Sequence, residues 1–191
     1  MKFILYRVLF TCMLVLSVAF GISIKELDTA TDKQKIVLYN AYSIGSELEL
    51  KHYGSKDLEY IMAAIAWHES GAGLDVANGI SYGVFQINLS TASTRAKRLN
   101  LGLTKQELKN LLMEDMYFSG SFAEMELKDW DRVHKGDIKK IVASYNGGYS
   151  WRNTMGYANM ILSSAKYFKE TGYFSKNFDL NGFIINDDKH N

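Results

Sequence analysis

Apolar side chains recur every three to four residues along most of this 191-residue chain, and that spacing is typical of helices that bury one face. The last run is the most regular, because its positions follow the spacing i, i+3, i+4, i+7 and i+11. They are Tyr157, Met160, Ile161, Ser164 and Phe168. No proline interrupts any of these runs, since the sequence contains none. The pattern predicts a mainly α-helical fold.

Capping residues mark several expected helix ends. Thr104 and Glu107 fit the capping box that starts a helix. Asp137 can cap a further helix, which should stop at Gly147-Gly148. An earlier helix is expected over residues 33–50, where apolar and charged side chains alternate at helical spacing.

The stretch from Gly71 to Asn88 lacks this period and is rich in Gly, Ser and Asn. Such composition favours a short β-hairpin or an ordered loop. Functional residues concentrate in loops held by a rigid scaffold. We therefore expect a small β element beside a cleft, within an otherwise helical fold.

The first 21 residues have the layout of a secretory signal peptide. Lys2 and Arg7 give a positive start, residues 8–20 are mostly apolar, and this run ends in small residues around Ala19 and Gly21. The segment predicts an exported, periplasmic protein, with an uncleaved membrane anchor as the alternative. The single cysteine lies inside it, so no disulfide is expected in the remainder.

The rest of the chain has the composition of one globular unit, with 47% hydrophobic and 23% charged residues and no repeat or linker. We expect an N-terminal helical segment at 22–54, a main domain at 55–170 and a peripheral tail at 171–191. The net charge of +1 predicts no partner, and the basic stretch Arg95–Arg98 is short enough to be a solvated helix face. Nucleic-acid binding is therefore not expected.

An acid ends the most apolar of the expected helices. Counted at about 100° per residue from Leu58, Glu69 lies about 20° away and so joins the buried stripe. Trp67 falls on the opposite side and His68 on a flank, while Gly71 can end the helix. Burial raises the pKa of a carboxyl group, which suits a general acid. The alternative is a Glu that reaches solvent or pairs with a nearby base.

Four ordered motifs resemble the soluble lytic transglycosylase (SLT) family of peptidoglycan-cleaving enzymes. They are Glu69-Ser70, the Gly-Val-Phe-Gln of residues 83–86, the Ser-Tyr-Asn-Gly-Gly of residues 144–148, and Tyr157 on the last helix. The family reads Gly-Leu-Met-Gln and Ala-Tyr-Asn-Ala-Gly at the two middle positions. The resemblance covers roughly residues 50–170, and four motifs in order are more specific than any one of them.

The resemblance implies a lysozyme-like fold and a lytic reaction. Members cut the β-1,4 bond between N-acetylmuramic acid and N-acetylglucosamine without water, leaving a 1,6-anhydro end, and use no cofactor or metal. Glu69 would act first as acid and then as base. The alternatives are a lysozyme-type muramidase, for which Asp75 or Asp115 is the second acid, and a non-catalytic glycan-binding component.

The resemblance also implies the residues that contact the substrate, which are Ser70, Gly83, Phe85, Gln86, Tyr145, Asn146 and Tyr157. Some have a plainer alternative. The Ser70 hydroxyl can bind backbone at the helix end, and Gln86 can hold its loop instead of a sugar. Either tyrosine can orient Glu69 or be an ordinary core residue.

Aromatic rings suit sugar faces, and Trp151, Tyr149 and Tyr82 flank the motifs. The expected partner is therefore the peptidoglycan glycan strand. A secretion, conjugation or motility complex is an expectation from resemblance to small exported members of the family.

Overall fold

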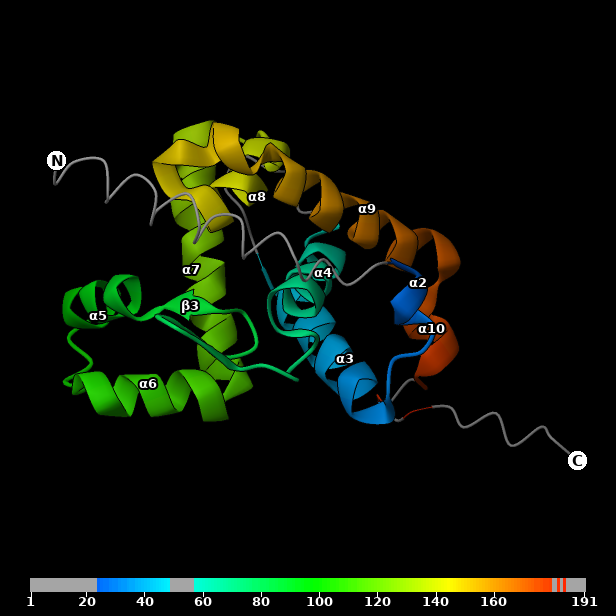
Figure 1. The fold of residues 1–191 in the computed structure, drawn as a ribbon, viewed down its shortest axis with the longest axis horizontal. Coiled ribbons are helices and arrows are strands. Elements are labelled where there is room, and N and C mark those ends of the chain that lie inside the picture. Colours follow the sequence, from blue (N-terminus) through cyan, green and yellow to red (C-terminus); the bar gives the residue numbers. More distant parts are fainter. Residues whose placement is uncertain (1–23, 49–56, 180–181, 183, 185–191) are drawn as a thin grey trace, which may run out of the picture.

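A computed structural model of the chain describes residues 24–48, 57–179, 182 and 184 (Figure 1). Ten helical elements and three strands occur within these residues. The helices before the sheet are α2 (Ile24–Leu27), α3 (Asp32–Ser46) and α4 (Leu58–Ser70). The strands are β1 (Ala77–Asn78), β2 (Ser81–Tyr82) and β3 (Ile87–Asn88). The later helices are α5 (Leu89–Arg98), α6 (Lys105–Glu114), α7 (Met116–His134), α8 (Ile138–Gly147), the 3₁₀ helix η1 (Gly148–Thr154), α9 (Met155–Thr171) and α10 (Tyr173–Asn177).

The expected helix ends are confirmed. Thr104 and Glu107 form a reciprocal capping box at the start of α6. Asp137 accepts a hydrogen bond from the Lys140 backbone N–H and caps α8, which ends at Gly147. Helix α3 corresponds to the helix expected over residues 33–50 but ends earlier, at Ser46. The mainly α-helical prediction is therefore correct.

The predicted β element is a three-stranded antiparallel sheet in the order β1-β2-β3. Asn78 pairs with Ser81 and Tyr82 pairs with Ile87. Asn88 ends β3 and caps α5 by accepting hydrogen bonds from the backbone of Ser90 and Thr91. In Figure 1 the sheet lies with α5 and α6 on one side of α4, while α2, α3 and α10 lie on the other.

Helix α4 is the centre of the core, and this corrects the expected position of Trp67. The Trp67 side chain is only 2% exposed, although it lies opposite Glu69 on the helix. Helices α3 and α9 pack against α4, so nine of its 13 residues are buried and none of the others is fully exposed. The prediction failed because the helical period distinguishes two faces only when one of them meets water.

The expectation of a peripheral tail at residues 171–191 is wrong for its first part, which packs in the core. Tyr173, Phe174 and Phe178 are at most 6% exposed and belong to the same core cluster as α4. Phe174 and Phe178 pack on aromatic rings of α3, with Tyr42 and Tyr39 at ring-centroid distances of 4.3 and 4.5 Å. The core therefore extends through α10 to residue 178.

No helix among the described residues is long and apolar enough to cross a membrane. The predicted signal segment at residues 1–21 lies outside the described part of the chain.

Gly83 fixes the sheet against the helices that follow it. Its φ is +81°, and a Cβ atom there would lie 2.0 Å from the Leu112 carbonyl oxygen and 2.5 Å from Ser119 Oγ. The close approach of α6 and α7 therefore requires the glycine here, which is a different role from the substrate contact that the resemblance implies. Gly83→Ala should destabilise the fold by about 2 kcal/mol, because the new Cβ is strained and meets backbone. Urea unfolding measures this loss, and Gly79→Ala is the control, since its Cβ position is open.

Candidate active site

A groove of about 620 Å³ opens beside the C-terminal end of α4. One wall consists of β2, β3 and α5, and the other consists of α7, α8 and the start of η1. Glu69 lines the groove between them, together with Gln86, Tyr145 and Asn146. The fold therefore brings residues from three separate sequence motifs to one cavity.

Glu69 is placed by the way α4 ends. Gly71 takes a left-handed conformation and its backbone N–H caps the helix, so the chain turns away directly after Glu69 and Ser70. Burial raises the pKa of Glu69 to about 7, and a hydrogen bond from Tyr157 acts in the opposite direction. The predicted inward position of the acid is thus accompanied by the pKa that a proton donor needs near neutral pH.

Tyr157 lies on α9 and contacts the acid directly. Its hydroxyl donates a hydrogen bond of 2.6 Å to Glu69 Oε1. Burial raises the pKa of Tyr157 well above its usual value, so the phenol stays protonated and remains a donor. Of the alternatives for this residue, the structure favours the one that orients Glu69.

Tyr157→Phe should raise the pKa of Glu69 above about 7, because the hydrogen bond it removes stabilises the charged carboxylate. Any activity that depends on protonated Glu69 should then persist to higher pH. A pH–rate profile of the variant beside wild type measures the shift. If activity in the variant fell at the same pH as in wild type, or at a lower pH, the role assigned to Tyr157 would be contradicted.

Tyr145 holds the loop between β2 and β3 from the opposite wall. Its hydroxyl donates a hydrogen bond of 2.8 Å to the Phe85 carbonyl oxygen. The Phe85 ring is 0% exposed, so the predicted sugar contact by this side chain is corrected. The Phe85 side chain anchors the loop in the core, and the Phe85 carbonyl oxygen accepts the hydrogen bond from Tyr145.

Gln86 stands in the loop at a φ of +47°. Its Nε2 donates to the carbonyl oxygens of Asp75 and Gly83, at 3.1 and 3.0 Å. Its Oε1 is buried and has no hydrogen-bond partner among the described residues. The amide nitrogen therefore stabilises the loop through these two hydrogen bonds. Gln86 also lines the groove, as Glu69 does.

The other two predicted contact residues differ in access. Ser70 is 3% exposed, and its hydroxyl donates to the Ala66 carbonyl and accepts from the Gly73 N–H. It therefore shapes the turn after α4, as its plainer alternative states. Asn146 is exposed and lines the groove, where its amide is free to meet a ligand.

The other acids that line the groove are not those expected from the sequence. Asp115 caps α7 and Asp75 accepts from the Ala77 N–H, and neither lines the groove. Glu126 and Asp129 of α7 line it instead. Their spacing of three residues places both on one face of a helix, which is the signal that could have indicated them.

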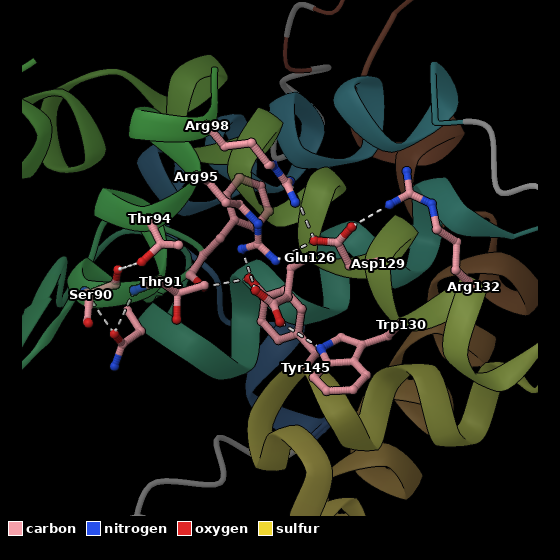
Figure 2. A network of polar contacts seen from close by, with 12 residues as sticks. Ser90, Thr91, Thr94, Arg95, Arg98, Glu126, Asp129, Trp130, Arg132 and Tyr145 are labelled. Carbon is pink, nitrogen blue, oxygen red and sulfur yellow. Dashed lines mark hydrogen bonds and ion pairs between the residues drawn. The ribbon is translucent and has the colours of Figure 1, made fainter. Parts of the chain in front are cut away.

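The interpretation of Arg95–Arg98 as a solvated helix face is wrong for Arg95, which is buried. The residue is 7% exposed and crosses from α5 to α7 (Figure 2). Its guanidinium donates to Glu126 Oε2 at 2.5 Å and to Asp129 Oδ2 at 3.0 Å. A buried cation of this kind needs its carboxylates, so the two walls are tied together at this point.

An aromatic pair forms part of the second wall. The Trp130 indole donates a hydrogen bond of 2.6 Å to Glu126 Oε1 and lies edge-on to Tyr149, with ring centroids 5.0 Å apart. Tyr149 is 83% exposed and offers a ring face to a ligand. Of the three aromatic residues expected near the cleft, only Tyr149 lines the groove, and Trp130 was not anticipated.

Within the described residues, no group of three or more His, Cys, Asp or Glu side chains is placed to hold a metal ion. His68 lies beside Glu69 in sequence, and its Nε2 is 2.8 Å from Ser164 Oγ. Burial lowers the pKa of His68 to about 4, so its ring is neutral at pH 7.

The fold and groove define a mainly helical protein with a small antiparallel sheet and a half-buried acid between two walls. No protein-family model matches the chain, and no solved structure matches it. A relative from Enterobacteria phage T4, described as an uncharacterized 20.7 kDa protein in the vs-regB intergenic region, is 38% identical over 122 residues. The matched part covers 62% of this chain and 67% of the relative, so the chain belongs to the same family as that phage protein.

Proposed function

We propose that this protein is a peptidoglycan lytic transglycosylase that uses Glu69 as its acid and base. The observation that carries the proposal is the Glu69 carboxyl group, which faces a groove and has a pKa raised by burial to about 7. The resemblance of the four motifs to the SLT family supplies the reaction class. Three of those motifs contribute residues to this one groove, and Tyr157 of the fourth donates to Glu69.

In the proposed reaction, protonated Glu69 donates its proton to the glycosidic oxygen as the bond to the muramic acid C1 breaks. The acetamido group of the substrate stabilises the positive charge that develops at C1. The glutamate, now charged, removes the proton from the muramic acid C6 hydroxyl, whose oxygen bonds to C1. Glu69 ends protonated, and the product is the 1,6-anhydro end.

The groove wall suits a glycan strand. Tyr149 presents an exposed ring, and Trp130 supports it edge-on. Sugar C–H faces pack on such rings, and Asn146 adds an amide for the polar groups of the sugar. The proposed partner is therefore the peptidoglycan strand, reached by export through residues 1–21.

A muramidase is the second candidate, and the observation in its favour is that Glu126 and Asp129 share the groove with Glu69. A hydrolase of this type needs a second carboxylate that attacks C1 or activates water. Both Glu126 oxygens already accept hydrogen bonds, one from Arg95 and one from Trp130. Asp129 likewise accepts from Arg95 and Arg132, so the lytic reaction is favoured.

Mass spectrometry of the products from purified peptidoglycan tests the proposal. The expected products are 1,6-anhydro-muramoyl ends. Each is lighter than a reducing end by the mass of one water molecule, about 18 Da, because the lytic reaction adds no water. Reducing ends would establish the muramidase instead. Binding of the strands without cleavage would overturn both and leave a glycan-binding protein.

A further inference from the structure

The groove carries a set of charges that the proposed reaction does not use. We call it the charge network: Arg95 and Arg98 on α5, and Glu126, Asp129 and Arg132 on α7 (Figure 2). Three guanidinium groups thus face two carboxylates, which leaves one positive charge in excess within the network. Four of the five residues line the groove.

The inner half of the charge network is satisfied internally. The Arg95 side chain is 8% exposed and binds both carboxylates. Glu126 is enclosed by Arg95 and the Trp130 indole. These contacts fix the position of Asp129 and leave the inner half with little capacity for a ligand.

The outer half has hydrogen-bond capacity to spare. Arg98 approaches Asp129 only to 3.8 Å, beyond hydrogen-bond distance, and its side chain is 61% exposed. Arg132 donates once to Asp129, at 2.6 Å, and its side chain is 65% exposed. A guanidinium carries five N–H donors, so most donors of this pair are available. In Figure 2 the two arginines approach Asp129 from different sides.

We propose that Arg98 and Arg132 bind free carboxylates on the peptide stems of the glycan strand. Guanidinium groups recognise carboxylates through paired, charge-assisted hydrogen bonds. One added carboxylate brings the charge network to three groups of each sign. This inference rests on the proposed function, because it takes the peptidoglycan strand as the substrate of the groove.

The reach of a stem fits this placement. Each stem is attached to a muramic acid, and about four extended residues span about 13 Å. Glu69 and Arg98 line the same groove, so a strand seated in it brings its stems to the wall that carries Arg98. Asp129, held by Arg95, binds Arg132 directly and lies 3.8 Å from Arg98, so both outer guanidinium groups lie near one carboxylate.

The test uses a muropeptide tetrasaccharide with free stem carboxylates and the same compound with those groups converted to methyl esters. Binding to the full-length Glu69→Gln protein, which should not consume the ligand, is measured by calorimetry at low salt. The free-carboxylate form should bind about three- to tenfold more tightly, since each exposed charge pair contributes modestly. Arg98→Gln combined with Arg132→Gln should remove that difference. Lys97→Gln, an exposed charge on the same helix α5, should leave it unchanged.

The outcomes separate this inference from the proposed function. Equal binding of the two compounds, or a difference that survives the double arginine substitution, would overturn the stem assignment. If wild type still cleaves both compounds to anhydro products, the lytic function stands without it. If wild type cleaves neither compound and the Glu69→Gln protein binds neither, both proposals fall together.

Discussion

Glu69→Gln should lower the rate of strand cleavage by about 10²- to 10⁴-fold, the range that a positioned proton donor contributes. Glutamine keeps the size of the side chain and can still accept the Tyr157 hydrogen bond, but it has no proton to donate to the glycosidic oxygen. Glu124→Gln is the matched control, because Glu124 pairs with Lys128 on α7 and does not line the groove. Release of fragments from purified peptidoglycan measures both. Full activity in the Glu69 variant would place the acid elsewhere.

The same substitution should also change how stability depends on pH. The folded-state pKa of Glu69 is raised from 4.5 to about 7, so its contribution to stability is complete below 4.5 and is lost as pH rises through 7. That loss is on the order of 3 kcal/mol between these limits. Glutamine does not ionise and avoids it, so Glu69→Gln should gain stability over wild type between pH 5 and pH 8. Urea unfolding of both proteins at pH 5 and at pH 8 measures the gain. If the difference in unfolding free energy between variant and wild type were equal at the two pH values, a raised pKa would be contradicted.

Arg95→Met should lower the free energy of unfolding by about 3–5 kcal/mol, the cost of removing one partner from a buried ion pair. Methionine fills much of the same space but leaves the Glu126 and Asp129 carboxylates without the cation that spans them. It also removes the tie between the α5 and α7 walls. Cleavage should therefore fall together with stability.

Two variants test the reason for this loss. Arg98→Met removes a mostly exposed charge from the same network and should cost less than about 1 kcal/mol. Adding Glu126→Gln to Arg95→Met should recover part of the loss, because it removes one of the unpaired carboxylates. Equal costs for the two arginines, measured by urea unfolding, would show that Arg95 is not the buried link.

The features that the sequence predicts well depend on contacts close along the chain. The caps at Thr104 and Asp137 join residues three positions apart. The end of α4 follows from Gly71, which directly succeeds Ser70. Tyr157 is 88 residues from Glu69, and only the ordered motifs linked the two.

The features that escaped prediction depend on what packs against each element. Trp67 is buried because α4 is enclosed by other helices, which its own period does not show. The carboxylates that pair with Arg95 are 31 and 34 residues away, so its short basic stretch looked like a solvated surface. Phe174 and Phe178 are buried by aromatic partners on α3, more than 130 residues earlier in the chain.

Glu69 is a half-buried acid whose pKa is raised to about 7, the range that a proton donor needs near neutral pH. Carbon-13 NMR of the glutamate side-chain carboxyl groups, assigned by comparison with Glu69→Gln, follows its titration directly. A midpoint near 7 in wild type is expected, and it should coincide with the fall of cleavage on the alkaline side. A midpoint near the ordinary value of 4.5 would contradict the account, because the group would then be charged where it must donate a proton.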